Sequence, residues 1–159
     1  MAYGIMFALA GASLAAALAG VGSILGVRTA GQAGAGLVAE DPDKFGKVLL
    51  LTALPGTQGI YGFLAAILIA NATGLLGGEV LDLDIAQGLQ VFMAALPVAI
   101  TGLFSGMFQG QVSAAGVNVI AKKPEAMGKA VILSALVETY AVLGLLVTIL
   151  LIDGLDLTS

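Results

Sequence analysis

One carboxylate, that of Glu138, lies inside an otherwise uncharged apolar stretch of 23 residues, from Ala130 to Ile152. Placing a carboxylate at the centre of a bilayer costs about 2.5–3.5 kcal/mol on insertion scales and more on other measures. Acidic residues in such segments line ion pathways or bind ions. Glu138 is therefore the first candidate for chemistry, and its expected ligand is an ion.

A second polar group lies in residues 54–63, which read LPGTQGIYGF. Four of these residues fall at i, i+3, i+4 and i+7, the spacing of one helical face. They are Leu54, Thr57, Gln58 and Tyr61. Pro55 has no N–H, so the carbonyl of Leu51 loses its helical partner, and two glycines loosen the same turn. A freed carbonyl at membrane depth is tolerated only where it is buried in protein or lines a cavity.

A third polar residue, Gln109, lies at a similar depth. Gln58 is 11 residues from Lys47, Gln109 is 13 from Lys122, and Glu138 is 9 from Lys129. At a rise of about 1.5 Å per residue, the three side chains lie roughly 16, 20 and 14 Å from these basic residues. They fall within about 6 Å of one level, before helix tilt.

Hard cations take oxygen ligands of this kind. One carboxylate, two amide oxygens, a hydroxyl and a carbonyl would form a cage with a single negative charge, which suits a monovalent cation. Tyr61 is expected to donate a hydrogen bond to Glu138, and Thr139 is a second supporting residue. Alone, either glutamine would more often be an interhelical hydrogen bond worth about 0.6 kcal/mol.

Composition places the chain in a bilayer. Of the 159 residues, 59% are hydrophobic and 10% are charged, and the mean hydropathy is +1.07, whereas soluble domains have about 25% charged residues. The chain contains no Cys, His or Trp, which excludes disulfides, thiolate or imidazole metal sites and Cys- or His-based catalysis. Six Lys and Arg residues form no basic stripe for nucleic acid.

Charged and turn residues divide the apolar chain into four segments, at about residues 3–39, 45–74, 85–121 and 126–152. Each segment is long enough to cross a bilayer as a helix, so the sequence predicts an all-α membrane protein with four transmembrane helices. All six basic residues lie on the side of the short loops 40–44 and 122–125, and the other side has only acidic residues. These are Glu79, Asp82, Asp84, Asp153 and Asp156. The positive-inside rule predicts that both short loops are cytoplasmic and both termini outside.

The chain also repeats itself without gaps at an offset of 82 residues. Pro42 corresponds to Pro124, Lys47 to Lys129 and Thr57 to Thr139. The offset pairs one short loop with the other, so the two hairpins are parallel repeats. We expect a first hairpin at 1–79 and a second at 80–159. Glu138 corresponds to Gly56, so only the second hairpin carries a carboxylate.

These strings resemble the rotor-ring proteolipid of V-type ATPases (subunit K or c), most nearly the bacterial sodium-transporting form. The resemblance covers essentially the whole chain and is carried by LPGTQGIYGF, by SGMFQGQ at 105–111 and by LVETYAVLG at 136–144. It implies Na⁺ ligands at the Leu54 backbone oxygen, Thr57, Gln58, Gln109 and Glu138, with Tyr61 supporting Glu138. It also implies a closed ring of identical protomers, a membrane stator with a basic residue and the central stalk of an ATPase.

The expected function is therefore the ion-carrying rotor of a sodium-translocating ATPase in the cell membrane. The chain has no G-x-x-x-x-G-K-[ST] pattern, so ATP is expected to be hydrolysed on another subunit. One alternative is the same rotor carrying H⁺, although a proton would need only the carboxylate. A more remote alternative is a passive pore or a structural membrane oligomer.

Overall fold

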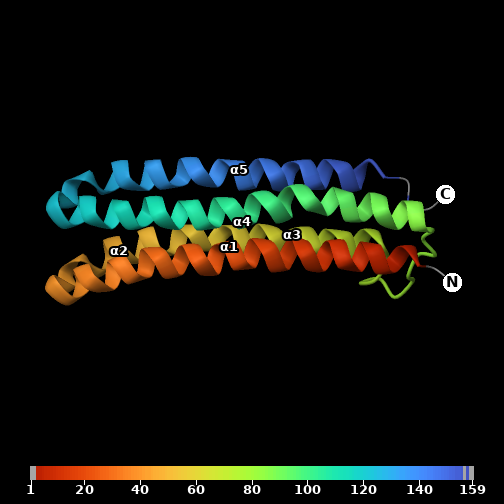
Figure 1. Ribbon diagram of the computed structural model, residues 1–159, viewed down its shortest axis with the longest axis horizontal. Coiled ribbons are helices and arrows are strands. Elements are labelled where there is room, and N and C mark those ends of the chain that lie inside the picture. Colours follow the sequence, from red (N-terminus) through yellow and green to blue (C-terminus); the bar gives the residue numbers. More distant parts are fainter. Residues whose placement is uncertain (1–2, 156, 158–159) are drawn as a thin grey trace.

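The computed structural model describes residues 3–155 and 157, and four long helical segments run side by side through it (Figure 1). They are α1 (Gly4–Glu40), α2 (Phe45–Ala53) continued by α3 (Thr57–Ala72), α4 (Ile85–Lys122) and α5 (Met127–Asp153). All four segments are long and apolar enough to cross a membrane. The predicted membrane class and number of spans are confirmed, and the predicted ends differ from the observed ones by at most two residues.

Both hairpins have the same orientation. In Figure 1 the α1–α2 and α4–α5 turns lie at one end, and the two termini and the α3–α4 loop lie at the other. The two turns have the same construction: a short 3₁₀ helix follows each, η1 (Pro42–Lys44) and η3 (Pro124–Ala126). The residues that enter them, Asp41 (φ −143°, ψ 87°) and Lys123 (φ −139°, ψ 80°), share one backbone conformation. The 82-residue repeat of the sequence is therefore a repeat of structure.

The second span differs from the fourth at one point. A 3₁₀ turn, η2 (Leu54–Gly56), separates α2 from α3, whereas α5 continues without interruption through the corresponding residues 136–138. Pro55 explains the difference, because it cannot donate the helical hydrogen bond that Val137 donates in α5. The predicted distortion at Pro55 is thus present, and it lies at the level of Gln58.

Helices α1 and α4 are in contact backbone to backbone. A Cβ atom on Gly22 would lie 2.5 Å from the carbonyl oxygens of Gly102 and Leu103, and one on Gly106 would lie 2.5 Å from the carbonyl carbon of Gly22. Any larger side chain would force the helices apart, which is the role of small residues between membrane helices. Helix α3 packs on α1, and helix α5 packs on α4. Helices α3 and α5, which carry Gln58 and Glu138, also contact each other.

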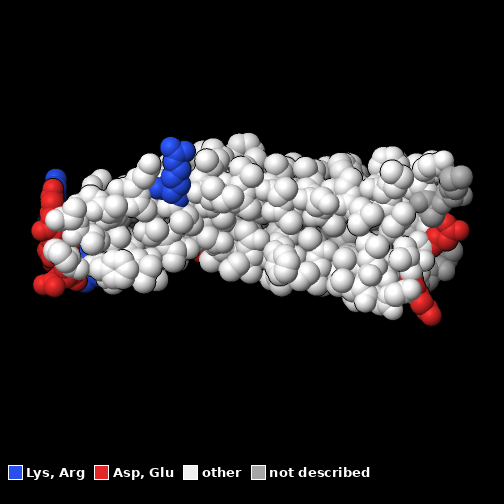
Figure 2. Space-filling view, turned by 90° about the horizontal axis from the view of Figure 1, so that it is seen from below, with Lys and Arg blue, Asp and Glu red and all other residues white. Residues whose placement is uncertain are grey.

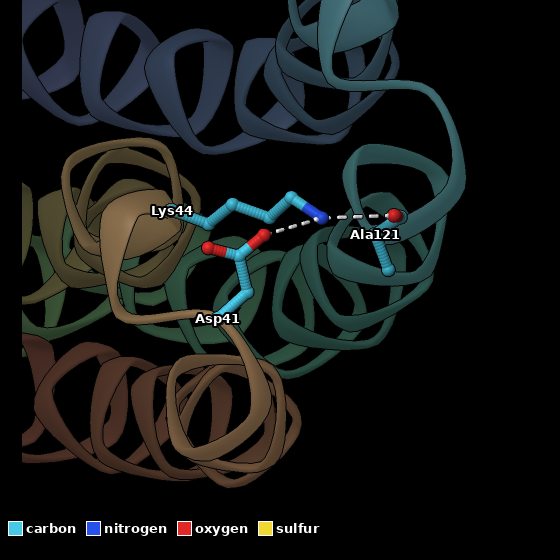
Figure 3. Close-up of polar contacts among 3 residues, drawn as sticks. All are labelled: Asp41, Lys44 and Ala121. Carbon is cyan, nitrogen blue, oxygen red and sulfur yellow. Dashed lines mark hydrogen bonds and ion pairs between the residues drawn. The ribbon is translucent and has the colours of Figure 1, made fainter.

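Acidic side chains gather at both ends of the molecule, basic side chains lie at and toward one of these ends, and most of the surface between them carries no charge (Figure 2). At the end with the short turns, Lys44 joins the two hairpins (Figure 3). Its Nζ lies 3.1 Å from Asp41 Oδ2 and donates to the carbonyl of Ala121 at 3.0 Å, where a positive charge meets the carboxyl end of α4. Asp156, assigned by its charge to the opposite end, lies outside the described residues.

Candidate ion-binding site

Helices α3, α4 and α5 bring four of the predicted residues into one hydrogen-bonded chain. Tyr61 donates its hydroxyl to Glu138 Oε1 at 2.6 Å, and Gln109 donates from Nε2 to Glu138 Oε2 at 3.3 Å. Gln58 in turn donates from Nε2 to Gln109 Oε1. Both oxygens of the Glu138 carboxylate therefore have a donor within the protein.

The environment changes across this chain of contacts. Gln58 and Gln109 are fully buried between the helices, while Glu138 is partly exposed. Glu138 lies on the wall of a shallow groove of about 350 Å³ along the outer side of α5, with Ala135, Val142 and Leu143. The site is thus closed by protein on the α1–α4 side and opens sideways at the outer surface of the bundle.

Ser105 belongs to the same cluster, although sequence reasoning did not select it. Its hydroxyl donates to the Val137 carbonyl at 2.9 Å, so its oxygen can only accept at the contact with Gln58 Nε2, 3.1 Å away. This contact fixes which end of the Gln58 amide faces α4. The signal was available, since Ser105 lies four residues before Gln109 and hence on the same face of α4.

The 3₁₀ turn presents the other predicted groups. The backbone N–H of Thr57 and its hydroxyl both donate to the Leu54 carbonyl, the hydroxyl at 3.0 Å. The Thr57 hydroxyl also lies 3.5 Å from Gln58 Oε1, the free end of that amide. Leu54, Thr57 and Gln58 are consequently held in one local arrangement, which is linked to the carboxylate through Gln109.

Thr139 lies elsewhere. Its hydroxyl donates to the Leu136 carbonyl of its own helix at 2.7 Å, on an exposed side of α5. It lines the outer groove beside Glu138, but its hydroxyl bonds to the backbone of α5 rather than to the carboxylate. The Thr139–Leu136 contact repeats the Thr57–Leu54 contact, as the 82-residue offset requires.

The donor set is that of a single-carboxylate site. Within residues 3–155 and 157, no three Asp, Glu, His or Cys side chains come together in a way that could hold a metal ion. The groups around Glu138 are instead amides, hydroxyls and a backbone carbonyl. Oxygen ligands of this kind with one negative charge fit an alkali cation better than a transition metal.

Comparison with known proteins gives two matches to one family, described as the C subunit of ATP synthase, at residues 10–69 and 92–151. The two matched segments begin 82 residues apart, which is the offset of the internal repeat.

Three relatives span most of the chain. The V-type sodium ATPase subunit K of Enterococcus hirae is 46% identical over 149 residues, covering 94% of this chain and 92% of its own. The A-type ATP synthase subunit K of Methanocaldococcus jannaschii is 42% identical over 144 residues, which are 91% of this chain and 60% of that protein. The 16 kDa proteolipid of the human V-type proton ATPase is 28% identical over 149 residues, with 94% and 92% covered.

The two matched segments together span most of the chain, and the structure is a duplicated bundle of four helices long and apolar enough to cross a membrane. The chain therefore belongs to the ATP synthase C-subunit family and is a multi-pass membrane protein similar to the rotor proteolipids of V-type ATPases.

Proposed function

We propose that this chain is the ion-carrying subunit of the rotor ring of a sodium-translocating V-type ATPase. The observation that carries the proposal is the Glu138 carboxylate, held within a membrane span by Tyr61 and Gln109 and backed by the buried amide of Gln58. A proton carrier would need only the carboxylate, so the oxygen-bearing groups around it favour a cation. The 46% identity with a V-type sodium ATPase subunit supports the same assignment.

Sodium would be held by Glu138, Gln109, Gln58, Thr57 and the Leu54 carbonyl. In the structure, Gln109 turns its Nε2 toward Glu138 and its Oε1 toward Gln58. A cation beside Glu138 would repel that N–H group and attract the amide oxygen. Loading therefore requires the Gln109 amide to turn its Oε1 from Gln58 to the ion, so that the hydrogen bond from Gln58 Nε2 to Gln109 is given up. Ser105 still accepts from Gln58 Nε2 and keeps the oxygen of that amide toward Thr57. Tyr61 keeps the carboxylate in place during the exchange.

The lateral opening of the site fits a carrier that turns past a stationary partner. A bound Na⁺ neutralises Glu138, which lowers the cost of exposing that residue to lipid. A basic residue on a stator subunit would favour the empty, ionised carboxylate and release the ion. Carrying one charge against 100 mV requires about 2.3 kcal/mol. In this proposal a soluble head supplies that energy by hydrolysing ATP and transmits it through a central stalk.

The orientation in the membrane follows from charge. Lys and Arg lie toward the end with the short turns 40–44 and 122–125, and the positive-inside rule assigns that end to the cytoplasm and both termini to the outside. The protomers would stand side by side in the bilayer of the cell membrane, each with the same orientation.

Carbodiimide modification of Glu138 tests the choice of ion. Modification should be slowed by Na⁺ at fixed pH and not by the same concentration of K⁺. The reason is that five ligands held on three packed helices would set the size of the ion cavity, and K⁺ is the larger ion. Equal slowing by K⁺, or no slowing by either cation, would overturn the sodium assignment. In the second case, slowing by lower pH alone would favour a proton-carrying rotor.

Purification of the membrane complex tests the assignment to an ATPase. The chain should copurify with a soluble ATPase head, and ion transport should stop when ATP is withheld. Conductance of the purified chain in vesicles without any partner would instead support a passive pore.

A further inference from the structure

One buried hydroxyl of α1 is not among the expected ion ligands. Ser23 is 8% exposed, and its oxygen accepts from the backbone N–H of Gly59 at 2.7 Å. Gly59 is the third residue of α3, which begins at Thr57, directly after the 3₁₀ turn η2. Ser23 therefore holds the first turn of α3, next to the backbone that carries the Leu54 carbonyl.

The N–H of Gly59 needs an acceptor from outside its own helix. The first four N–H groups of an α-helix have no partner within it, and η2 makes α3 begin at Thr57. In an uninterrupted helix this N–H would bond to the carbonyl of Pro55, four residues earlier. The hydroxyl of Ser23 takes the place of that carbonyl, so a side chain of α1 stabilises the interruption of the second span.

The second hairpin shows what the same position does beside an unbroken helix. The 82-residue offset pairs Ser23 with Ser105 and Gly59 with Ala141. Helix α5 is continuous through this region, so the N–H of Ala141 has its helical acceptor. Ser105 accepts from Gln58 Nε2 instead. The two serines thus hold neighbouring residues of one span, Ser23 by the backbone and Ser105 by a side chain.

The contact depends on a close approach of α1 to the second span. A Cβ on Gly59 would lie 3.3 Å from Ser23 Oγ and 3.6 Å from the Cα of Gly20, so any side chain there would press against the hydroxyl. Helix α1 also packs on η2, because a Cβ on Gly26 would lie 2.7 Å from the Cβ of Pro55. The backbone of α1 thus supports the turn, and Ser23 adds a hydrogen bond to that support.

The direction of the Leu54 carbonyl depends on this turn. In a regular α-helix the carbonyl would accept from the N–H of Gln58, four residues on. In η2 it accepts from the N–H and the hydroxyl of Thr57. If the Gly59 N–H returned to the Pro55 carbonyl, α3 would lengthen toward Leu54, and the Leu54 carbonyl and the Thr57 hydroxyl would move together.

We propose that Ser23 is a positioning residue of the ion site. By accepting from the Gly59 N–H, it holds η2 in the 3₁₀ form. That form presents the Leu54 carbonyl and the Thr57 hydroxyl to Na⁺. Ser23 acts through the backbone and is itself no ligand. The inference rests on the proposed function, since it assigns a further residue to the same site.

Ser23→Ala removes only the hydroxyl group and tests the inference on the intact complex in native membranes. The Na⁺ concentration that halves the rate of carbodiimide modification of Glu138 should rise by about 2- to 12-fold, the range that the net free energy of one protein hydrogen bond gives. The rate of modification without Na⁺, and its pH dependence, should stay as in the parent chain, because Tyr61 and Gln109 hold the carboxylate. A general loosening of helix packing would change both measurements.

Thr29→Val is the matched control. Thr29 lies on the same helix, and its hydroxyl donates to the Leu25 carbonyl of that helix at 2.8 Å. Valine keeps the shape of threonine and removes the hydroxyl, so the half-protecting Na⁺ concentration should not change. An equal rise in both variants, no rise in Ser23→Ala, or an altered reaction of Ser23→Ala without Na⁺ would each overturn the role of Ser23.

The parent chain separates this inference from the proposed function. If Na⁺ does not slow the modification of Glu138 in the parent chain, the sodium assignment fails, and the role of Ser23 fails with it. If Na⁺ protects the parent chain and Ser23→Ala equally well, the sodium assignment stands and only the role of Ser23 is wrong.

Discussion

Replacing Ser105 by alanine tests whether the orientation of the Gln58 amide sets ion affinity. The substitution removes the oxygen that accepts from Gln58 Nε2 at 3.1 Å, and Gln58 is fully buried. A buried donor that loses its acceptor costs about 1–3 kcal/mol, and 1.4 kcal/mol corresponds to a factor of about 10 in an equilibrium constant. Part of this cost is relieved if the amide turns over, which would point its nitrogen at the expected ion.

We therefore expect Ser105→Ala to weaken Na⁺ binding by about tenfold, within a range of roughly 5- to 100-fold. The assay is the Na⁺ concentration that halves the rate of carbodiimide modification of Glu138, followed by mass spectrometry of the intact chain. Val137 keeps its own helical hydrogen bond in this variant, so α5 should remain in place.

Ser113→Ala is the matched control for this prediction. Ser113 is buried on the same face of α4, and its hydroxyl pairs with that of Ser134 at 2.7 Å without touching the Glu138 cluster. Its loss should lower thermal stability as much as the loss of Ser105 does, and leave the half-protecting Na⁺ concentration unchanged. The reasoning fails if both variants change Na⁺ protection equally, or if Ser105→Ala changes nothing.

Three further predictions concern the carboxylate, its amide partner and the helix contact. Gln109→Ile should weaken Na⁺ protection by about tenfold or more, since it removes a ligand and leaves Gln58 Nε2 without one acceptor; unchanged protection would remove Gln109 from the site. Glu138→Gln should abolish ATP-driven sodium uptake into vesicles while rings still form on native gels; residual uptake would argue against a carboxylate carrier. Gly22→Leu should lower the melting temperature in detergent, by an amount equivalent to about 1–3 kcal/mol or more of overpacking, whereas Gly20→Leu should not, because a Cβ there meets nothing within 4 Å.

Much of the fold could be predicted because a bilayer restricts the choices. Hydrocarbon thickness fixes the length of a span, and the absence of water in it requires helices. The exact repeat then fixed the parallel orientation of the two hairpins, since Lys47 and Lys129 must lie on one side. The positions of Gln58, Gln109 and Glu138 along the membrane normal followed from counting residues.

The direction of individual side chains was harder to predict. Thr139 follows Glu138 directly and was expected to support it, yet its hydroxyl bonds within its own helix. Ser105 was not selected, yet it touches both Gln58 and Val137. Neighbours in sequence point about 100° apart on a helix, so adjacency in the chain says little about a shared site.

The sequence by itself determined the membrane class, the four spans, the duplication and the single carboxylate, because each depends on composition or on spacing along one helix. Only the tertiary structure decided that Gly22 and Gly106 bring α1 and α4 into backbone contact, and that Tyr61 reaches Glu138. These features depend on how each helix is rotated about its axis and how closely it meets its neighbours. Both quantities are set by packing between residues far apart in the chain.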